Sequence, residues 1–146
     1  MQILRGLEQI SHSSSCVATI GTFDGVHLGH KKIIERLKKV ASDRGLCTTL
    51  VTFYPHPRLI VRGGSAPVKL LTSQEEKLEL LAETGLDQVL IIPFDESFSE
   101  MSYRVFVEDI LLNRLNVDAV VVGYDHAFGK NREGDFSNLQ AFSKKL

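Results

Sequence analysis

Four short apolar runs divide the chain. They cover residues 16–20, 46–53, 88–93 and 118–123 and carry many β-branched side chains. Runs that are apolar at almost every position are typical of strands buried on both faces, as in parallel sheets. The sequence therefore predicts four buried strands. The last run, with three consecutive valines, is the most strand-like segment of the chain.

Between these runs the apolar spacing changes to that of a helix. A glycine stop follows the first helical pattern at Gly45 and the second at Gly85. Ser73-Gln-Glu-Glu76 predicts a capping box for the second helix, Ser102 predicts the cap of a third, and another helix is expected from Phe136 onward. The side chains predicted to face the core are Ile33, Ile34, Leu37, Val40 and Ala41 in the first helix, Leu78, Leu81 and Ala82 in the second, and Phe106, Val107, Ile110, Leu111 and Leu115 in the third.

Strands that alternate with helices at this spacing indicate an α/β fold, with a parallel sheet and helices on both of its faces. Ligands bind such sheets at the carboxyl ends of the strands. Distinctive polar blocks begin at Gly21, Phe53 and Gly123, each at or just after the end of a predicted strand. We therefore expect these three blocks to meet at one site. Residues 54–70 are expected to form a long loop.

The most informative segment is the junction between the first strand and the first helix, from Thr19 to His30. His27 and His30 lie three residues apart where the helical pattern begins. The free N–H groups and the dipole of a helix N-terminus attract phosphate, and imidazoles add directional hydrogen-bond donors. The pattern is typical of a loop that handles nucleotides.

Gly21-Thr-Phe-Asp-Gly-Val-His-Leu-Gly-His30 resembles the HxGH signature of the nucleotidyltransferase superfamily. Its fuller form is similar to the FAD synthetase branch, usually the N-terminal half of bacterial bifunctional riboflavin kinase/FAD synthetase. Two further stretches resemble blocks of that branch, Thr52-Phe-Tyr-Pro-His-Pro-Arg58 and the segment from Val122 to Asp135. The resemblance spans residues 16–135. One position departs from the pattern, because His126 stands where the family often has phenylalanine.

The resemblance implies a Rossmann-like sheet and adenylyl transfer from ATP to FMN, with Mg²⁺ bound mainly through phosphate oxygens rather than in a dedicated protein site. By the same resemblance His27 and His30 are the catalytic residues and donate hydrogen bonds to the ATP phosphates and to the transition state. The residues expected to bind the nucleotide are Gly21, Thr22, Phe23, Asp24, Gly25, Gly29, Lys31 and Asp125, and those expected near the flavin are His56, Arg58, His126, Phe128 and Arg132.

Several of these residues have a second interpretation. Phe23 is either core packing or a wall beside the adenosine. Asp24 binds ribose, a metal or a neighbouring cation, or else it accepts hydrogen bonds within a turn or at a helix cap. Asp125 could serve a local turn, and Lys31 could lie solvated on the helix like its basic neighbours.

Composition narrows the class of protein. The 17 basic and 18 acidic residues nearly balance, so no electrostatic footprint for nucleic acid is present. Cys16 and Cys47 both lie in apolar runs and are expected to be buried free thiols in a cytoplasmic protein. The N-terminus lacks the apolar core of a signal peptide, and no run is long enough to cross a bilayer. The oligomeric state has no signature in the sequence.

The chain lacks a later Ser-Ser-x-x-Ile-Arg block that usually completes the ATP site of this branch, and the riboflavin kinase domain that ordinarily follows. We therefore expect residues 1–146 to be one nucleotidyltransferase domain that is incomplete at its C-terminus. Two alternatives remain open. One is a relative with another phosphorylated acceptor, such as a cytidylyltransferase, and the other is a nucleotide-binding module without catalysis.

Overall fold

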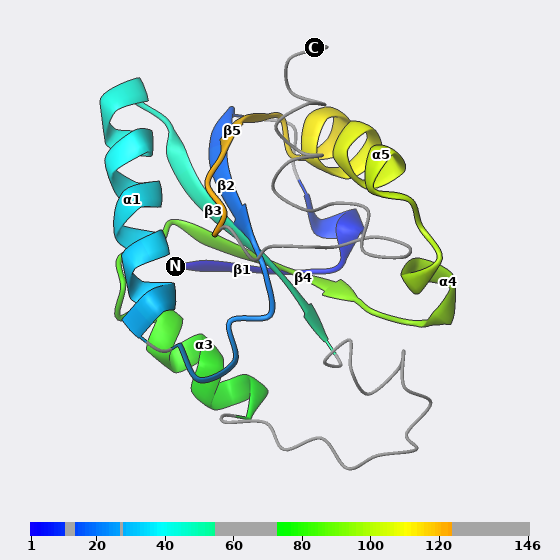
Figure 1. The fold of residues 1–146 in the computed structure, drawn as a ribbon, viewed down its shortest axis with the longest axis horizontal. Helices are drawn as coiled ribbons and strands as arrows, with labels where there is room; N and C mark the ends of the chain where they lie inside the picture. Colours follow the sequence, from blue (N-terminus) through cyan, green and yellow to red (C-terminus); the bar gives the residue numbers. More distant parts are fainter. Residues whose placement is uncertain (11–13, 27, 55–72, 124–146) are drawn as a thin grey trace.

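The computed structural model of the chain describes residues 1–10, 14–26, 28–54 and 73–123 (Figure 1). Within these residues five parallel strands form one sheet in the order β1-β4-β3-β2-β5. Their bounds are β1 Gln2–Arg5, β2 Cys16–Ile20, β3 Cys47–Tyr54, β4 Gln88–Pro93 and β5 Val117–Val120.

The four predicted strands and their parallel arrangement are confirmed. The last one is shorter than predicted, since β5 ends at Val120; a backbone bond from Val121 N–H to Ala18 O follows it among the residues described up to Gly123. Strand β1 was not predicted. Its four residues are too few to show a pattern, and it forms by pairing with β4, with Ile3 opposite Val89.

Helices begin and end largely where capping and glycine signals predict. Helix α1 covers Leu28–Arg44, α3 covers Gln74–Ala82, and Gly45 and Gly85 follow them with φ of 68° and 85°, the left-handed region in which glycine is favoured. Both halves of the capping box are present at the start of α3, between Ser73 and Glu76. Shorter helical segments are η1 Leu7–Gln9, η2 Asp24–Val26 and α4 Glu96–Ser99.

The third predicted helix begins at Ser102, whose hydroxyl accepts from Val105 N–H, and α5 Tyr103–Val105 leads into a π-helical segment, η3 Phe106–Arg114. All of its predicted core residues are buried. In the second helix Leu78 and Leu81 are buried, but Ala82 is exposed, so its predicted inward position is wrong. Ala82 ends α3, one residue past the face that Leu78 and Leu81 turn to the sheet, and Lys77 occupies that face instead.

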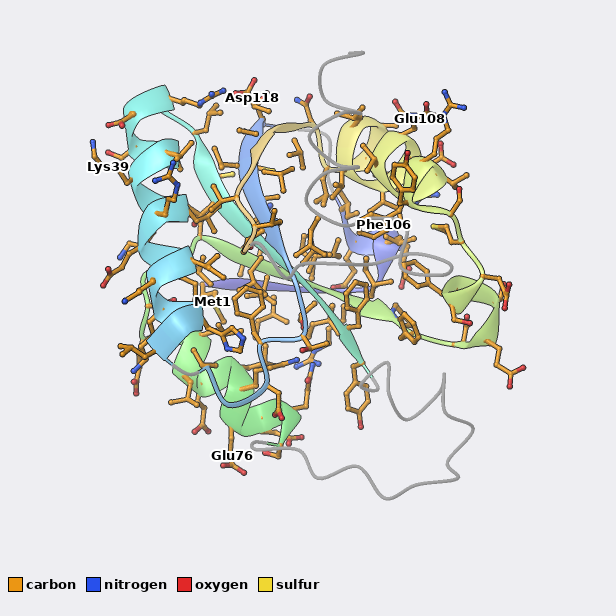
Figure 2. All side chains as sticks on the ribbon, in the orientation of Figure 1. Met1, Lys39, Glu76, Phe106, Glu108 and Asp118 are labelled. Carbon is orange, nitrogen blue, oxygen red and sulfur yellow. The ribbon has the colours of Figure 1, made fainter. Side chains whose placement is uncertain are left out.

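Helices cover both faces of the sheet, as predicted. Figure 1 shows α1 and α3 on one side and α4 and α5 on the other. Successive residues of a strand point to opposite faces, so that Leu50 joins the core beneath α1 while Val51 joins the core beneath η3. Phe106 lies inside the second of these layers, whereas Lys39 points outward from α1 (Figure 2).

The order of the strands creates a switch point beside β2. From β2 the chain moves through β3 to β4 on one side, and β5 then returns to the other side of β2. Open parallel sheets bind ligands at such a point, outside the carboxyl ends of the strands. The ends of β2, β3 and β5 therefore share one edge, as expected for the chain segments that begin there.

The predicted loop at 54–70, apart from Tyr54 at the end of β3, and the predicted helix from residue 136 lie outside the described residues. No helix in the described part of the chain combines the length and the apolar character needed to span a membrane.

Candidate functional site

The loop between β2 and α1 has an unusual backbone. Phe23 and Val26 have φ of 53° and 43°, and Gly25 between them has φ of 78°. A positive φ is uncommon for side-chain-bearing residues and is a genuine outlier for a β-branched one. Backbone strain of this kind persists only where the surrounding structure holds it, and it is concentrated at functional sites.

Gly21 begins this loop and allows its tight turn. Its N–H donates to Val51 O on β3 at 3.0 Å. A Cβ at Gly21 would come within 3.0 Å of the ring of Phe23, which folds back over it. Glycine at this position thus permits the close approach of the Phe23 ring.

His30 lies in the first turn of α1, as predicted, and is half-buried. Its imidazole packs on the ring of Phe23, with the ring centroids 4.7 Å apart. Phe23 itself is only 3% exposed and belongs to the core beneath α1 and α3. Of its two predicted roles, core packing is the one present, and the ring also supports the histidine. Its contact with a nucleotide remains a prediction.

Lys77 of α3 links the loop after β2 to strand β3. Its ammonium donates to Thr22 O and to Thr52 Oγ1, each at 3.0 Å, and Thr52 Oγ1 donates in turn to Thr22 O at 3.2 Å. The negative charge of Asp24 acts on this ammonium. Lys77 is thus a cation whose charge Asp24 influences, while binding of a ribose or a metal by Asp24 remains a prediction.

Sequence reasoning missed Lys77. The run Gln74-Glu-Glu-Lys77 is typical of a solvated first turn, and Glu76 points outward from α3 (Figure 2). The available signal was spacing, because Lys77 lies four residues before Leu81 and therefore on the same helix face. A lysine at the edge of an apolar helix face is ordinarily expected to extend its ammonium into solvent.

Burial lowers the pKa of Lys77 to about 8 from the ordinary 10.5, and the charge of Asp24 opposes that shift. From about pH 8 to 10.5 the folded chain has lost this proton while the unfolded chain still holds it. Stability rises with pH wherever the unfolded state binds more protons. We therefore expect Lys77 to raise the free energy of unfolding across this window, by at most about 1.4 kcal/mol per pH unit.

Urea unfolding of the parent and of Lys77→Met at pH 7.5, 8.5 and 9.5 measures this effect as the difference between the two chains, in which the other titrating groups cancel. The parent should gain stability relative to the variant as the pH rises. A difference that does not change with pH would contradict the lowered pKa.

The other predicted residues of the loop and helix are exposed or half-buried. Gly29 and Lys31 are exposed in the first turn of α1, and Thr22, Asp24 and Gly25 are half-buried. Arg36, Lys38 and Lys39 are exposed, in agreement with the prediction of a solvated basic face, and Lys39 pairs with Asp43.

The remaining predicted residues lie outside the described part of the chain: His27, His56, Arg58, Asp125, His126, Phe128 and Arg132. The strands that lead to most of them are described. Tyr54 ends β3 two residues before His56, and Gly123 comes two residues before Asp125, at the same edge of the sheet as the loop after β2.

The two cysteines are free and lie opposite one another on β2 and β3. Burial raises the pKa of Cys16 to about 11 and also raises that of Cys47. Cys16 is buried as predicted, whereas Cys47 is half-buried. Since the thiolate is the reactive form, neither thiol is prepared for nucleophilic attack. In the residues that the structure describes, no three His, Cys, Asp or Glu side chains gather as a metal site would require.

Comparison with a solved structure supports the fold. The fold matches that of a crystal structure described as a macrolide-efflux protein from Streptococcus pneumoniae. The TM-score is 0.82 at 20% sequence identity, and the match covers 97% of this chain and 47% of that one. At this level of identity the likeness concerns the fold alone.

Sequence comparison is more specific. The chain is 39% identical over 127 residues to the bifunctional riboflavin kinase/FMN adenylyltransferase of Listeria monocytogenes, which covers 87% of this chain and 40% of that protein. Its identity to the enzyme of the same name from Escherichia coli K12 is 39% over 142 residues, or 96% of this chain and 45% of that protein. The corresponding Haemophilus influenzae protein is 37% identical over 147 residues, and 47% of its length is covered.

The chain thus spans slightly less than half the length of these relatives. A family model described as FAD synthetase matches residues 9–146, which include the loop after β2, the first turn of α1 with His30, and Lys77. On this match and on the identities to its relatives, the chain belongs to the FAD synthetase family.

Proposed function

We propose that this chain transfers the adenylyl group of ATP to FMN, which gives FAD and pyrophosphate. The observation that carries the proposal is the strained loop after β2, which leads at the switch point of the sheet into a helix whose first turn holds His30. Membership of the FAD synthetase family and the similarity to proteins named FMN adenylyltransferase support the choice of substrates.

The reaction requires alignment more than acid–base chemistry. An oxygen of the FMN phosphate attacks the α-phosphorus of ATP, and the bond from that phosphorus to the bridging oxygen of the β-phosphate breaks. A phosphate monoester has a second pKa near 6, so near pH 7 the nucleophile is already mostly a dianion. No general base is needed. The protein must hold two anions in line and stabilise the charge that develops on the pyrophosphate.

The described residues suit these tasks. The loop after β2 and the N-terminus of α1 provide backbone N–H groups and the positive end of a helix dipole. His30 would donate to the phosphates from the first turn, held at its ring by Phe23, and His27 would act with it. Lys31, exposed in the same turn, would add a positive charge near the β- and γ-phosphates.

Magnesium fits this chemistry as a partner of the nucleotide. Mg²⁺ binds mainly through phosphate oxygens and takes few protein ligands. Asp24 is the carboxylate that the loop after β2 could offer it. When bound, it neutralises phosphate charge. Asp125 is proposed to contact the nucleotide. The flavin is proposed to lie near residues 54–69, with His56, Arg58, His126, Phe128 and Arg132 as its candidate contacts.

The test is to incubate this chain with FMN and magnesium-ATP and to measure FAD by chromatography, beside the double variant His27→Ala, His30→Ala. We expect FAD from the parent, and a rate reduced at least about 10²-fold in the variant, because each lost donor to the transition state typically has an effect of that size. Calorimetric binding of ATP to both chains accompanies the rates.

The alternatives have separate outcomes in the same experiment. ATP binding without FAD would support a binding module, or a site that needs the Ser-Ser-x-x-Ile-Arg segment absent from this chain. A preference for CTP with a phosphorylated alcohol over ATP with FMN would support a cytidylyltransferase and contradict the proposal.

The length of the relatives bears on the protein as a whole. Since they are named as bifunctional with riboflavin kinase and are only partly covered by this chain, we propose that this domain works beside a kinase that supplies its FMN.

A further inference from the structure

Of the charged side chains that the structure describes, only that of Lys77 is buried, with 6% of the residue exposed. A charge is costly to bury unless it is paired and hydrogen-bonded. Lys77 meets this requirement with acceptors in the loop after β2 and on β3, Thr22 O and Thr52 Oγ1, rather than with a partner on its own helix. The hydrogen bond to the loop therefore offsets part of the cost of burying the Lys77 ammonium.

The contacts join three elements that are distant in sequence. Lys77 on α3 lies 55 residues after Thr22, and Thr52 on β3 lies 30 residues after it. Two donors, the ammonium of Lys77 and the hydroxyl of Thr52, converge on the Thr22 carbonyl, and the ammonium also donates to Thr52 Oγ1. A carbonyl oxygen has two lone pairs, and both are used here.

The carbonyl of Thr22 belongs to the peptide unit that enters the strained part of the loop. Phe23, with φ of 53°, follows it directly, and Gly25 and Val26 continue with positive φ. A backbone of this kind reverts unless its ends are held. Lys77 holds the entry to the loop at Thr22. The negative charge of Asp24, two residues after Thr22, acts on the positive charge of Lys77. Helix α3 also packs on η2, and in Figure 1 the loop runs beside α3.

We propose that Lys77 is a positioning residue of the nucleotide site. Its ammonium, bonded to the Thr22 carbonyl and to Thr52 Oγ1, fixes the loop after β2 in the conformation that presents its N–H groups and His30 to phosphate. Because Lys77 is buried and its ammonium bonds to the protein, it acts through the loop and not by contact with the substrate. The kinetic consequence rests on the proposed adenylyl transfer, whereas the structural consequence does not.

The chain offers a matched control. Lys38 on α1 also donates from its ammonium to a backbone carbonyl, that of Thr84 at 2.8 Å, but it is exposed and this carbonyl lies outside the loop. Lys77→Met and Lys38→Met therefore remove the same kind of bond, with and without the link to the site. Lys77→Arg keeps the charge and the donors, and Thr52→Val removes the hydroxyl with little change of shape.

The first measurement is amide hydrogen exchange on the folded chains without ligand. In Lys77→Met we expect residues 21–26 to exchange roughly tenfold faster or more, because a bond to a charged donor is lost, while residues 33–44 of α1 keep the parent rate. Lys38→Met should match the parent in the loop, Thr52→Val should move in the same direction as Lys77→Met, and Lys77→Arg should restore part of the protection.

The second measurement is kinetic. A loop displaced by about 1 Å can reduce a rate about 10²-fold, so kcat/KM for magnesium-ATP should fall by up to this factor in Lys77→Met, with KM for FMN unchanged. Lys77→Arg should recover part of the loss. If the parent makes no FAD, adenylyl transfer by this chain alone is not supported, and the exchange measurement still decides the role of Lys77.

Three results would overturn the inference. The first is parent-like exchange of residues 21–26 in Lys77→Met. The second is faster exchange spread evenly over α1 and β3, which would indicate a loss of global stability only. The third is an equal effect of Lys38→Met on the loop. If Lys77→Met does not fold, Thr52→Val and Lys77→Arg carry the same comparison.

Discussion

Replacing His30 alone with alanine is expected to reduce kcat for FAD formation by roughly 10²- to 10³-fold, equivalent to about 2.7–4 kcal/mol of transition-state stabilisation. The imidazole is half-buried in the first turn of α1, and its ring is held 4.7 Å from that of Phe23. A donor held in this way needs no reorganisation when charge develops on the departing pyrophosphate, whereas water or a mobile side chain would. Steady-state rates with FMN and magnesium-ATP at saturation give kcat directly.

Lys32→Ala is the matched control, since Lys32 lies two residues further along the same helix and is exposed. It should leave kcat within a factor of about 2, and urea unfolding should show that both variants are folded. A kcat for His30→Ala within about threefold of the parent would mean that the imidazole does not stabilise the transition state. A rise in KM for ATP with kcat unchanged would assign it to ground-state binding only.

Replacing Leu37 with alanine is expected to lower the free energy of unfolding by about 2–5 kcal/mol. Leu37 is fully buried at the middle of α1, in the core that also holds Phe23 and Leu50. The truncation removes apolar contacts and leaves a cavity that close-packed neighbours fill only in part. The effect should extend to the site, because this core fixes the helix that carries His30.

Leu28→Ala supplies the comparison within one helix and one residue type. Leu28 begins α1 and is 71% exposed, so its truncation should change stability by no more than about 0.5 kcal/mol. Urea unfolding of both variants measures the difference. Equal destabilisation by the two substitutions would contradict the packing of α1 against the sheet described here.

Local patterns in the sequence predicted most of the elements. The apolar runs gave strands β2, β3 and β4 with bounds within one residue, and the capping box and glycine stops gave the ends of α1 and α3. These features depend on neighbours within a few residues, and the physical chemistry that produces them acts over the same range. Strand β1 escaped prediction because its four residues form a strand only through pairing with β4.

The candidate site divides in the same way. The sequence determined that a glycine-rich turn between a strand and a helix carries His27 and His30, since the residue types and their spacing are local. It left open whether Phe23 packs in the core and which partner Asp24 has. Only the tertiary structure decided the packing of Phe23, together with the order of the strands and the burial of Lys77 beneath the loop, while the ligand of Asp24 stays a prediction. The Lys77 ammonium and the Thr22 carbonyl are 55 residues apart in the chain and meet because α3 packs against the sheet. No short-range pattern in the sequence encodes such a contact.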